Sequence, residues 1–198
     1  MGNREALLAG AKRCIVEKGY AHTTARDIVA ASGTNLASIG YHFGSKDALL
    51  DAAILDSFDD WDDDIEAALA GQSGGAPADR LAAFLDVLID KVRTDRAMVA
   101  ASVQWVAQIE FSATVRGQLA EAFAGARRSF ATMLLGTDDV DDETALAVGS
   151  LGLALVNGLV LQWLVDTDRA PSGREVAAAL RAVALPAQAS VRGRRAPG

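Results

Sequence analysis

The sequence predicts an all-α protein with a small N-terminal helical head and a larger helical body. About 51% of the 198 residues are hydrophobic, Ala and Leu are prominent, and there are only four prolines. Such a composition favours helices over sheets. Apolar residues recur at helical spacing along most of the chain, and no segment shows the strict alternation that is typical of a strand. The length is enough for one large or two small domains with a real core.

The single cysteine and the N-terminus favour a cytoplasmic location. Cys14 has no partner for an internal disulfide, which fits a reducing compartment. The first 13 residues contain no apolar run before their charges, so they do not resemble a secretion signal.

Residues 5–18 predict an amphipathic first helix, which Gly19 ends. Cys14 lies on its apolar face, where a small core residue is favoured over a reactive thiol. The other apolar positions at helical spacing are Leu7, Leu8, Ala11 and Ile15.

Two short helices with a tight turn between them follow. Thr24 can cap the first of them, and Asp27 stands three residues later in a variant of the capping box. Gly33 permits a sharp turn with positive φ. Asn35 is a second N-cap and opens a short run that ends before Gly44. This pattern predicts a helix-turn-helix whose second helix is the recognition helix.

A long helix is predicted over residues 46–69, with Ser45 as its cap. It carries an acidic cluster, for which a solvated face is favoured over a metal site because no His or Cys lies nearby. The cluster comprises Asp56, Asp59, Asp60, Asp62, Asp63 and Asp64. After a loop at 72–79, further helices are predicted at 79–94, 96–111, 113–135, 141–166 and 173–184.

The charge distribution allows a nucleic-acid partner despite a net charge of −7. Residues 1–50 carry six basic and four acidic side chains, a net charge of +2, whereas the remaining 148 residues carry 13 basic and 22 acidic ones, a net charge of −9. Only the local patch meets phosphate, so a weakly basic head on an acidic body is compatible with DNA binding. We expect modest non-specific affinity with a strong salt dependence.

The head resembles the DNA-binding domain of the TetR family of bacterial regulators. Residues 23–52 read TTARDIVAASGTNLASIGYHFGSKDALLDA, and the resemblance covers roughly residues 5–55. The features that carry it together are Thr24, Asp27–Ile28, Gly33, Tyr41–His42–Phe43 and Ser45–Lys46.

The resemblance implies a homodimeric transcriptional repressor that binds an inverted-repeat operator in double-stranded DNA and is released by a small effector. Repression and activation both stay open, because the sign depends on where the operator lies relative to the promoter. The expected domains are a helix-turn-helix domain at 1–46, an effector-binding and dimerisation body at 47–186, and a basic tail at 187–198 that is expected to be disordered.

The resemblance also implies the DNA contacts. Thr24, Tyr41, His42 and Lys46 are expected to touch phosphates, which sets the register on the duplex. Arg26 is placed to donate two hydrogen bonds to guanine. The remaining expected contacts come from the recognition helix, namely Asn35, Leu36, Ala37, Ser38 and Gly40.

Gly40 departs from the family pattern, in which many members carry an aromatic residue at this position. A glycine inside a helix costs about 1 kcal/mol relative to alanine. Close approach of the backbone to DNA and drift at a tolerant position both explain it, and both stay open.

Residues 144–165 contain no charged side chain, so by length they could span a bilayer. Acidic flanks, together with Asn157 and Gln162 inside the run, argue against a membrane span. A helix buried by its own domain and by a partner subunit is also apolar all round, and this dimer interpretation is favoured. The expected interface residues are Ser150, Ala154, Gly158 and Leu161, with Val176, Leu180 and Val183 from the last helix.

The family implies an effector pocket inside the body. An apolar effector is expected from the side chains available, although most of the aromatic ones must be plain core. The candidate lining residues are Phe84, Leu88, Met98, Ser102, Trp105, Gln108, Ile109, Phe123 and Asn157.

The sequence offers no catalytic site, metal site or cofactor site. His22 and His42 both lie in the head without metal-ligand spacing, and no serine-hydrolase, zinc-protease or phosphate-loop pattern is present. An enzyme is therefore disfavoured, and a membrane-tethered regulator remains the other alternative.

Overall fold

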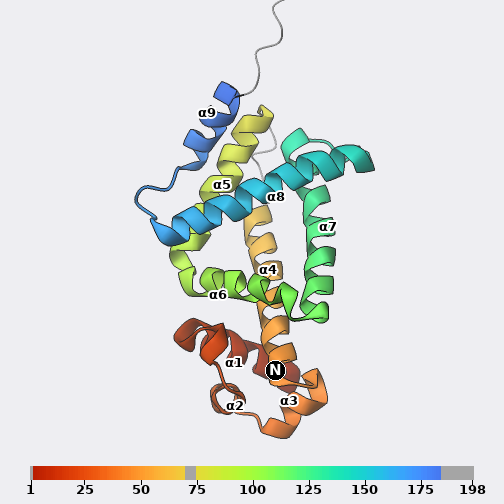
Figure 1. Ribbon diagram of the computed structural model, residues 1–198, viewed down its shortest axis with the longest axis vertical. Helices are drawn as coiled ribbons and strands as arrows, with labels where there is room; N and C mark the ends of the chain where they lie inside the picture. Colours follow the sequence, from red (N-terminus) through yellow and green to blue (C-terminus); the bar gives the residue numbers. More distant parts are fainter. Residues whose placement is uncertain (1, 70–74, 184–198) are drawn as a thin grey trace, which may run out of the picture.

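The computed structural model describes residues 2–69 and 75–183, with the backbone alone for residue 59 and residues 62–69. It is an elongated molecule with a head of three helices at one end, from which α4 runs into the body (Figure 1). The head comprises α1 (Asn3–Lys18), the 3-10 turn η1 (Tyr20–His22), α2 (Ala25–Ser32) and α3 (Leu36–Phe43). The rest comprises α4 (Lys46–Leu69), α5 (Pro77–Thr94), α6 (Arg96–Val106), the 3-10 turn η2 (Ala107–Glu110), α7 (Ala113–Leu135), α8 (Asp142–Val165) and α9 (Gly173–Val183).

The all-α prediction is confirmed, with differences at the ends of elements. α5 begins at Pro77, earlier than expected, because proline suits the first turn of a helix. α6 ends at Val106 and tightens into η2, where a single helix was expected to residue 111. The turn η1 was not predicted. The predicted loop 72–79 lies partly, and the predicted tail 187–198 entirely, outside the described residues.

One apolar core runs from the head into the body without a break. Leu7 and Ile15 of α1 and Leu50 of α4 are fully buried, and Trp105 of α6 is buried in the same cluster. The start of α7 closes this cluster with Val115. The predicted boundary between residues 46 and 47 therefore marks the end of a motif and not a break in packing.

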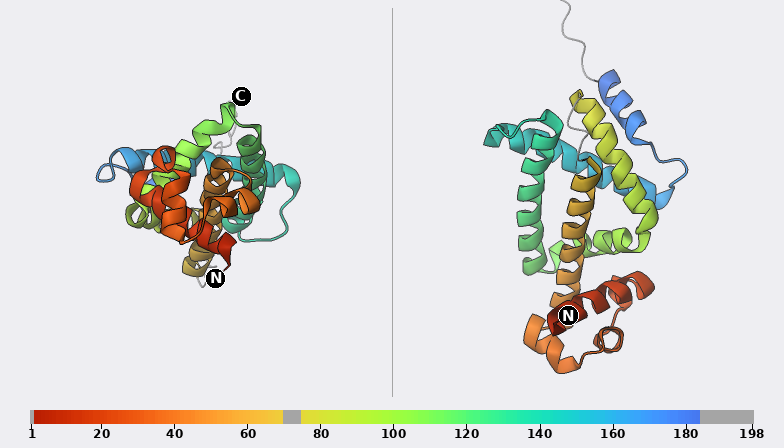
Figure 2. Two further views of the ribbon diagram at one scale, coloured as in Figure 1. Left: turned by 90° about the horizontal axis from the view of Figure 1, so that it is seen from below. Right: turned by 180° about the vertical axis from the view of Figure 1, so that it is seen from behind.

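A second core fills the far end of the body. Leu85 of α5 and Trp163 of α8 are its fully buried members, and Val176 of α9 packs against them. The Trp163 indole donates a hydrogen bond to the carbonyl of Pro171 at 2.9 Å, which holds the loop before α9. α9 lies along α5 in both side views (Figures 1 and 2).

Part of the acidic cluster on α4 ties the head to this helix. The Lys12 ammonium of α1 lies 2.7 Å from a carboxylate oxygen of Asp56 and 2.6 Å from one of Asp60. These two aspartates are thus paired, where a purely solvated face was expected. The side chains of Asp59, Asp62, Asp63 and Asp64 lie outside the described residues.

Glycines on α8 let it cross α7 at close range. A Cβ at Gly149 would lie 2.2 Å from the carbonyl oxygen of Arg127, and one at Gly152 would lie 2.0 Å from the Phe130 ring. Phe130 is buried and packs edge-on against Phe84, with ring centroids 5.3 Å apart, so it has little room to move. The inner face of α8 therefore requires these small residues.

Replacing Gly152 with alanine should destabilise the protein. The added methyl overlaps Phe130, and overpacking of this kind costs about 1–3 kcal/mol. Because about 1 kcal/mol shifts Tm by roughly 2–4 °C in a chain of this size, we expect thermal unfolding by circular dichroism to move down by several degrees.

The matched control is Gly125→Ala on α7, where an added Cβ would meet nothing within 4 Å. That variant should match or exceed the wild-type Tm, because alanine is the better helix former. Equal Tm values for the two variants would contradict the proposed crossing.

Candidate nucleic-acid interface

The first helix of the helix-turn-helix is fixed at its start by a reciprocal cap. The amide of Asp27 donates to the Thr24 hydroxyl oxygen at 3.2 Å, and the amide of Thr24 donates to the Asp27 carboxylate at 3.0 Å. The Thr24 hydroxyl itself donates to the same carboxylate at 2.6 Å. The capping box predicted from the sequence is thus confirmed, and it holds Thr24 in one orientation at an exposed position.

Side chains of α1 hold α2 from the other side. The Arg13 guanidinium donates to the carbonyl of Ala31 near the end of α2, and the Lys18 ammonium pairs with Asp27. Hydrogen bonds from Lys18 first, and then from Thr24, lower the pKa of Asp27 to about 2. Sequence analysis missed both positioning residues, for which the only signal is their basic character on the polar face of α1.

The turn and the start of α3 follow the predicted pattern. Gly33 ends α2 with φ of +68°, a left-handed conformation that a side chain rarely adopts. Asn35 then caps α3, and its side-chain oxygen Oδ1 accepts hydrogen bonds from the Ser38 amide at 3.0 Å and the Ser38 hydroxyl at 3.2 Å. The Asn35 side-chain amide nitrogen is left to donate outward.

The exposed face of α3 is the candidate reading surface. Tyr41 is 84% exposed and Leu36 is 54% exposed, which is unusual for side chains of their size in a small head. The Tyr41 ring meets the His42 ring edge-on with centroids 4.8 Å apart. Ala37 and Gly40 lie exposed on the same helix, and no atom outside the helix lies within 4 Å of a Cβ built at Gly40. Packing within the chain therefore does not require glycine at that position.

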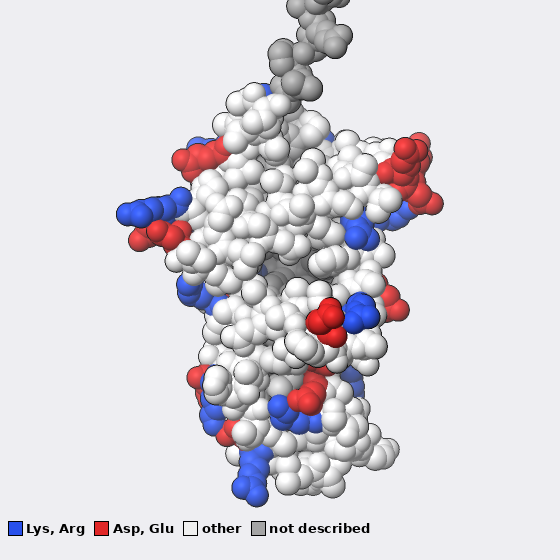
Figure 3. Space-filling view, in the orientation of Figure 1, with Lys and Arg blue, Asp and Glu red and all other residues white. Residues whose placement is uncertain are grey.

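Two cations flank this face. Arg26 is exposed on the first turn of α2. Lys46 is half-buried, donates to the carbonyl of Thr23 at 3.4 Å and pairs with Asp47 at 2.9 Å. In Figure 3 basic side chains project from the lower end of the molecule, where the head lies.

Nine of the ten predicted DNA-contact residues lie at least partly on the surface, and Ser38 does not. Ser38 is 9% exposed, and its hydroxyl is used inside the cap of α3. It supports the recognition helix from within, so its place in the predicted contact set is corrected. Thr24, Arg26, Asn35, Leu36, Ala37, Gly40 and Tyr41 are exposed, and His42 and Lys46 are half-buried.

Most of the residues predicted to line an effector pocket are instead spread over the two cores and the surface. Ser102 is buried and its hydroxyl donates to the carbonyl of Val99 at 2.8 Å, whereas Asn157 and Ile109 are exposed. Apolar packing accounts for the difference. Phe84 and Leu88 belong to the far core, Met98, Trp105 and Phe123 belong to the core shared with the head, and Gln108 is half-buried in η2.

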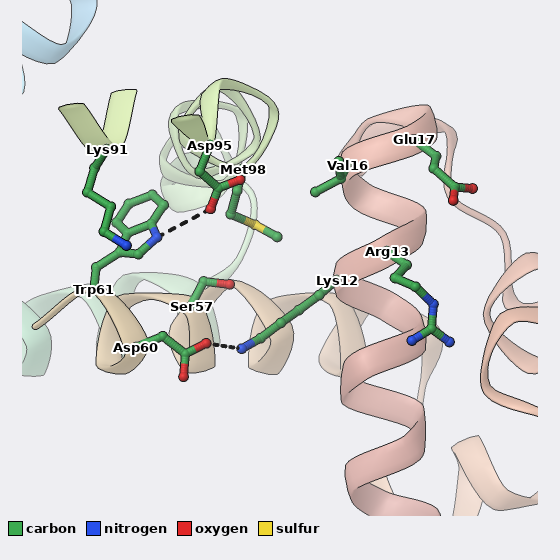
Figure 4. Close-up of a pocket in the computed structure, with 10 residues that line it drawn as sticks. All are labelled: Lys12, Arg13, Val16, Glu17, Ser57, Asp60, Trp61, Lys91, Asp95 and Met98. Carbon is green, nitrogen blue, oxygen red and sulfur yellow. Dashed lines mark hydrogen bonds and ion pairs between the residues drawn. The ribbon is translucent and has the colours of Figure 1, made fainter. Parts of the chain in front are cut away.

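A groove of about 410 Å³ opens between the head and the body (Figure 4). Lys12 and Val16 of α1 face it from one side, and Trp61 of α4 with Met98 of α6 from the other. Its floor carries mixed charge, including Asp95, to which the Trp61 indole donates a hydrogen bond at 3.4 Å. Met98 is the one predicted pocket residue among those that line the groove.

The predicted dimer residues fall on two kinds of surface. Ala154 and Leu161 are exposed on the outer face of α8, and Ser150 and Gly158 are half-exposed beside them. On α9, Val183 is 73% exposed and Leu180 is half-buried. Val176, which was expected in the dimer interface, is only 8% exposed because it packs inside the protomer against α5.

Sequence comparison identifies the head. Residues 7–53 match the sequence model of bacterial regulatory proteins of the tetR family. This match covers the head alone, about a quarter of the chain. The transcriptional repressor AcnR of Corynebacterium efficiens is 39% identical over 49 residues, which are 25% of this chain and 26% of that protein. The transcriptional regulator BetI of Rhizobium meliloti is 28% identical over 180 residues, 89% of this chain and 84% of that protein.

Solved structures with the same fold extend the likeness to the whole chain. A TetR transcription regulator from Haloarcula marismortui has a TM-score of 0.70 at 21% identity and covers 89% of this chain and 95% of its own. A transcriptional regulator from Saccharomonospora viridis, solved in complex with choline, has a TM-score of 0.67 at 22% identity and covers 90% and 93%. The relatives and solved structures named above are all described as transcriptional regulators or repressors. The match to AcnR spans only about a quarter of the length of that repressor.

Gly40→Ala separates the two explanations of the glycine on α3. Nothing lies near the new methyl, so we expect stability to rise by about 1 kcal/mol from helix propensity alone. If the bare backbone approaches DNA, operator affinity measured by fluorescence anisotropy should nevertheless fall. The control Gly117→Ala on α7 is equally open and should leave affinity unchanged. Unchanged operator affinity in Gly40→Ala would instead identify a tolerant position.

Proposed function

We propose that this protein is a transcriptional repressor that binds an inverted-repeat operator as a homodimer and is released by a small effector. The observation that carries the proposal is the exposed face of α3 on a head whose two short helices are both capped. Tyr41 on that face is 84% exposed, and packing inside the chain does not explain a ring of this size at that position. A phenolic hydroxyl at such a place suits a phosphate contact.

The side-chain groups that the internal hydrogen bonds leave available suggest how the head contacts DNA. Arg26 projects from the first turn of α2 and offers a planar donor pair that matches guanine O6 and N7. The side-chain amide of Asn35 and the side chains of Tyr41 and His42 donate further hydrogen bonds to the DNA. Lys46 adds a point charge at the base of the motif. Operator DNA is in the cytoplasm of a bacterium, and we place the protein there.

The outer face of α8 supports the homodimer. Leu151, Ala154, Gly158, Leu161 and Val165 follow each other at spacings of three and four, the pattern of a helix–helix seam. Leu151 is 57%, Leu161 48% and Val165 85% exposed in the single chain. In Figure 3 the face over α8 carries charged side chains only near its edges. A large exposed apolar patch marks an interaction site.

A second copy of the chain fits this face better than a lipid bilayer. α8 is, within the described part of the chain, the one helix long and apolar enough to cross a membrane by length and composition. Its inner face, however, is locked into the body by the α7 crossing at Gly149 and by the buried Trp163. Two such faces related by a two-fold axis would place two recognition helices on one duplex.

The test is selection of binding sites from random duplex DNA with the full chain, followed by anisotropy on the selected site. We expect an inverted repeat bound about a thousandfold tighter than a scrambled duplex at the same salt concentration. Ala154→Trp should break the dimer in light scattering and abolish this specific binding.

The matched control is Ala124→Trp at an exposed position on α7, outside the residues expected at the interface. It should remain dimeric and bind like the wild type. A selected site without two-fold symmetry would contradict the homodimer on DNA, and a dimeric Ala154→Trp would contradict the interface.

The proposed effector is a small molecule that combines an apolar body with a polar end. The head–body groove is lined by Trp61 and Met98 beside charges of both signs, so it suits such a molecule better than a purely apolar one. The groove adjoins α6, the helix that shares its core with the head.

Choline, imidazole and a neutral apolar control such as toluene are the probes for this proposal. An effector should raise Tm and weaken operator binding in the same concentration range, because it selects a conformation that DNA does not. A probe that raises Tm without changing operator affinity binds the protein but is not an effector. Trp61→Ala should remove the response if the groove is the site, and a response that persists in this variant would contradict the groove as the site.

A further inference from the structure

A buried carboxylate joins the head to the body through a single oxygen atom. Asp51 of α4 is 8% exposed, and its Oδ1 accepts a hydrogen bond from the Tyr20 hydroxyl at 2.7 Å and one from the Trp105 indole at 2.9 Å. Tyr20 belongs to η1 of the head, and Trp105 lies at the end of α6 and is fully buried. Three elements that are far apart in the sequence thus meet at one point.

The energetics of the hydrogen bonds to Asp51 favour one arrangement of the head against α6. Burial raises the pKa of Asp51, against the opposing effect of the two donors. A buried carboxylate that loses a donor is strongly penalised, so each bond opposes displacement of its partner. Hydrogen bonds to a charged acceptor are also shorter and more directional than neutral ones.

Apolar contacts alone would not fix the same geometry. The surrounding core, which includes Leu7 and Met98, holds the head against α6 but tolerates small shifts, because hydrophobic attraction has no direction. The two bonds to Asp51 add the missing directional constraint. Lateral movement of α6 therefore moves η1, and with it the start of α2.

A line of touching aromatic rings continues from this junction to the head–body groove. The Trp105 ring lies 6.1 Å from Phe58, and Phe58 lies 5.6 Å from Trp61, between centroids. Trp61 lines the groove and donates to Asp95 there. The junction is thus connected by direct contacts to a place where a ligand can enter.

We propose that Asp51 is a positioning residue for DNA binding, which fixes the angle of the DNA-reading head against α6. The inference rests on the proposed function, because the angle matters only if two heads must fit two half-sites. It assigns to Asp51 no contact with DNA. Its effect is on the spacing between half-sites that the dimer accepts.

The first experiment compares operators that differ only in spacing. Wild-type protein should prefer the selected operator over versions with one base pair added or removed between the half-sites. Asp51→Ala should lose most of this preference, while its affinity for a scrambled duplex stays unchanged. Asp51→Asn should retain the preference, because an amide oxygen can accept both hydrogen bonds.

Tyr20→Phe provides a second variant that keeps the carboxylate and the Trp105 bond. It cuts only the link to the head, and it should show the same loss of spacing preference as Asp51→Ala. The matched control is Ser57→Ala, which removes a buried hydroxyl that bonds only to the carbonyl of Ala53 in its own helix. Ser57→Ala should bind every operator like the wild type.

Hydrogen exchange measured by mass spectrometry tests the junction without DNA. In Asp51→Ala and in Tyr20→Phe, amides of α1 and α2 should exchange faster than in wild type, whereas amides of α5 and α8 should not change. Equal protection of the head in wild type and both variants overturns the inference whatever the DNA results are.

The two proposals fail in different ways. If wild-type protein selects no operator, the proposed function is wrong. Hydrogen exchange alone then tests whether the Asp51 junction holds the head in place. If wild type selects an operator and Asp51→Ala shows the same spacing preference, the positioning role is wrong and the proposed function stands.

Discussion

The structure depends on one apolar core that α1, α4 and α6 share. Because Leu7 and Ile15 of the head are buried in the same cluster as Met98 and Trp105 of α6, the head cannot move as an independent unit. α4 passes through this cluster and extends beyond it, so a tilt of α4 is limited by the same contacts. Any signal from the body to the DNA must therefore pass as a shift of packed helices, which have a few discrete arrangements.

Local features of the head could be predicted, because their causes lie within four residues of each other. Thr24 with Asp27, the glycine at position 33 and the Asn35 cap are short-range rules, and the structure has all three. Ser38 is the exception among these local features. A polar residue on a recognition helix suggests a base contact, whereas the structure turns Ser38 inward beside Ile39 and uses its hydroxyl in the cap.

Long-range features could not be predicted from periodicity. A helical pattern says that one face of α6 is buried but not which helix covers it, so Trp105 suggested a pocket and lies instead in the core that α6 shares with the head. The small residues of α8 pose the same difficulty. The residues singled out from the sequence, Ser150, Ala154 and Gly158, lie at least partly exposed, whereas the glycines at the α7 crossing, Gly149 and Gly152, were not singled out.

The same long-range contacts change the electrostatic argument about DNA. Lys12 is paired with two aspartates of α4, Arg13 donates to α2, and Lys18 pairs with Asp27. Half of the basic residues that gave the head its positive charge therefore hold it together and hold it to the body. Each head therefore has few basic side chains left to neutralise phosphates, and the salt dependence of DNA affinity follows the number of phosphates neutralised. In the proposed homodimer, recognition then rests on hydrogen bonds and on the placement of two heads, so the head angle that we assign to Asp51 matters more than the net charge.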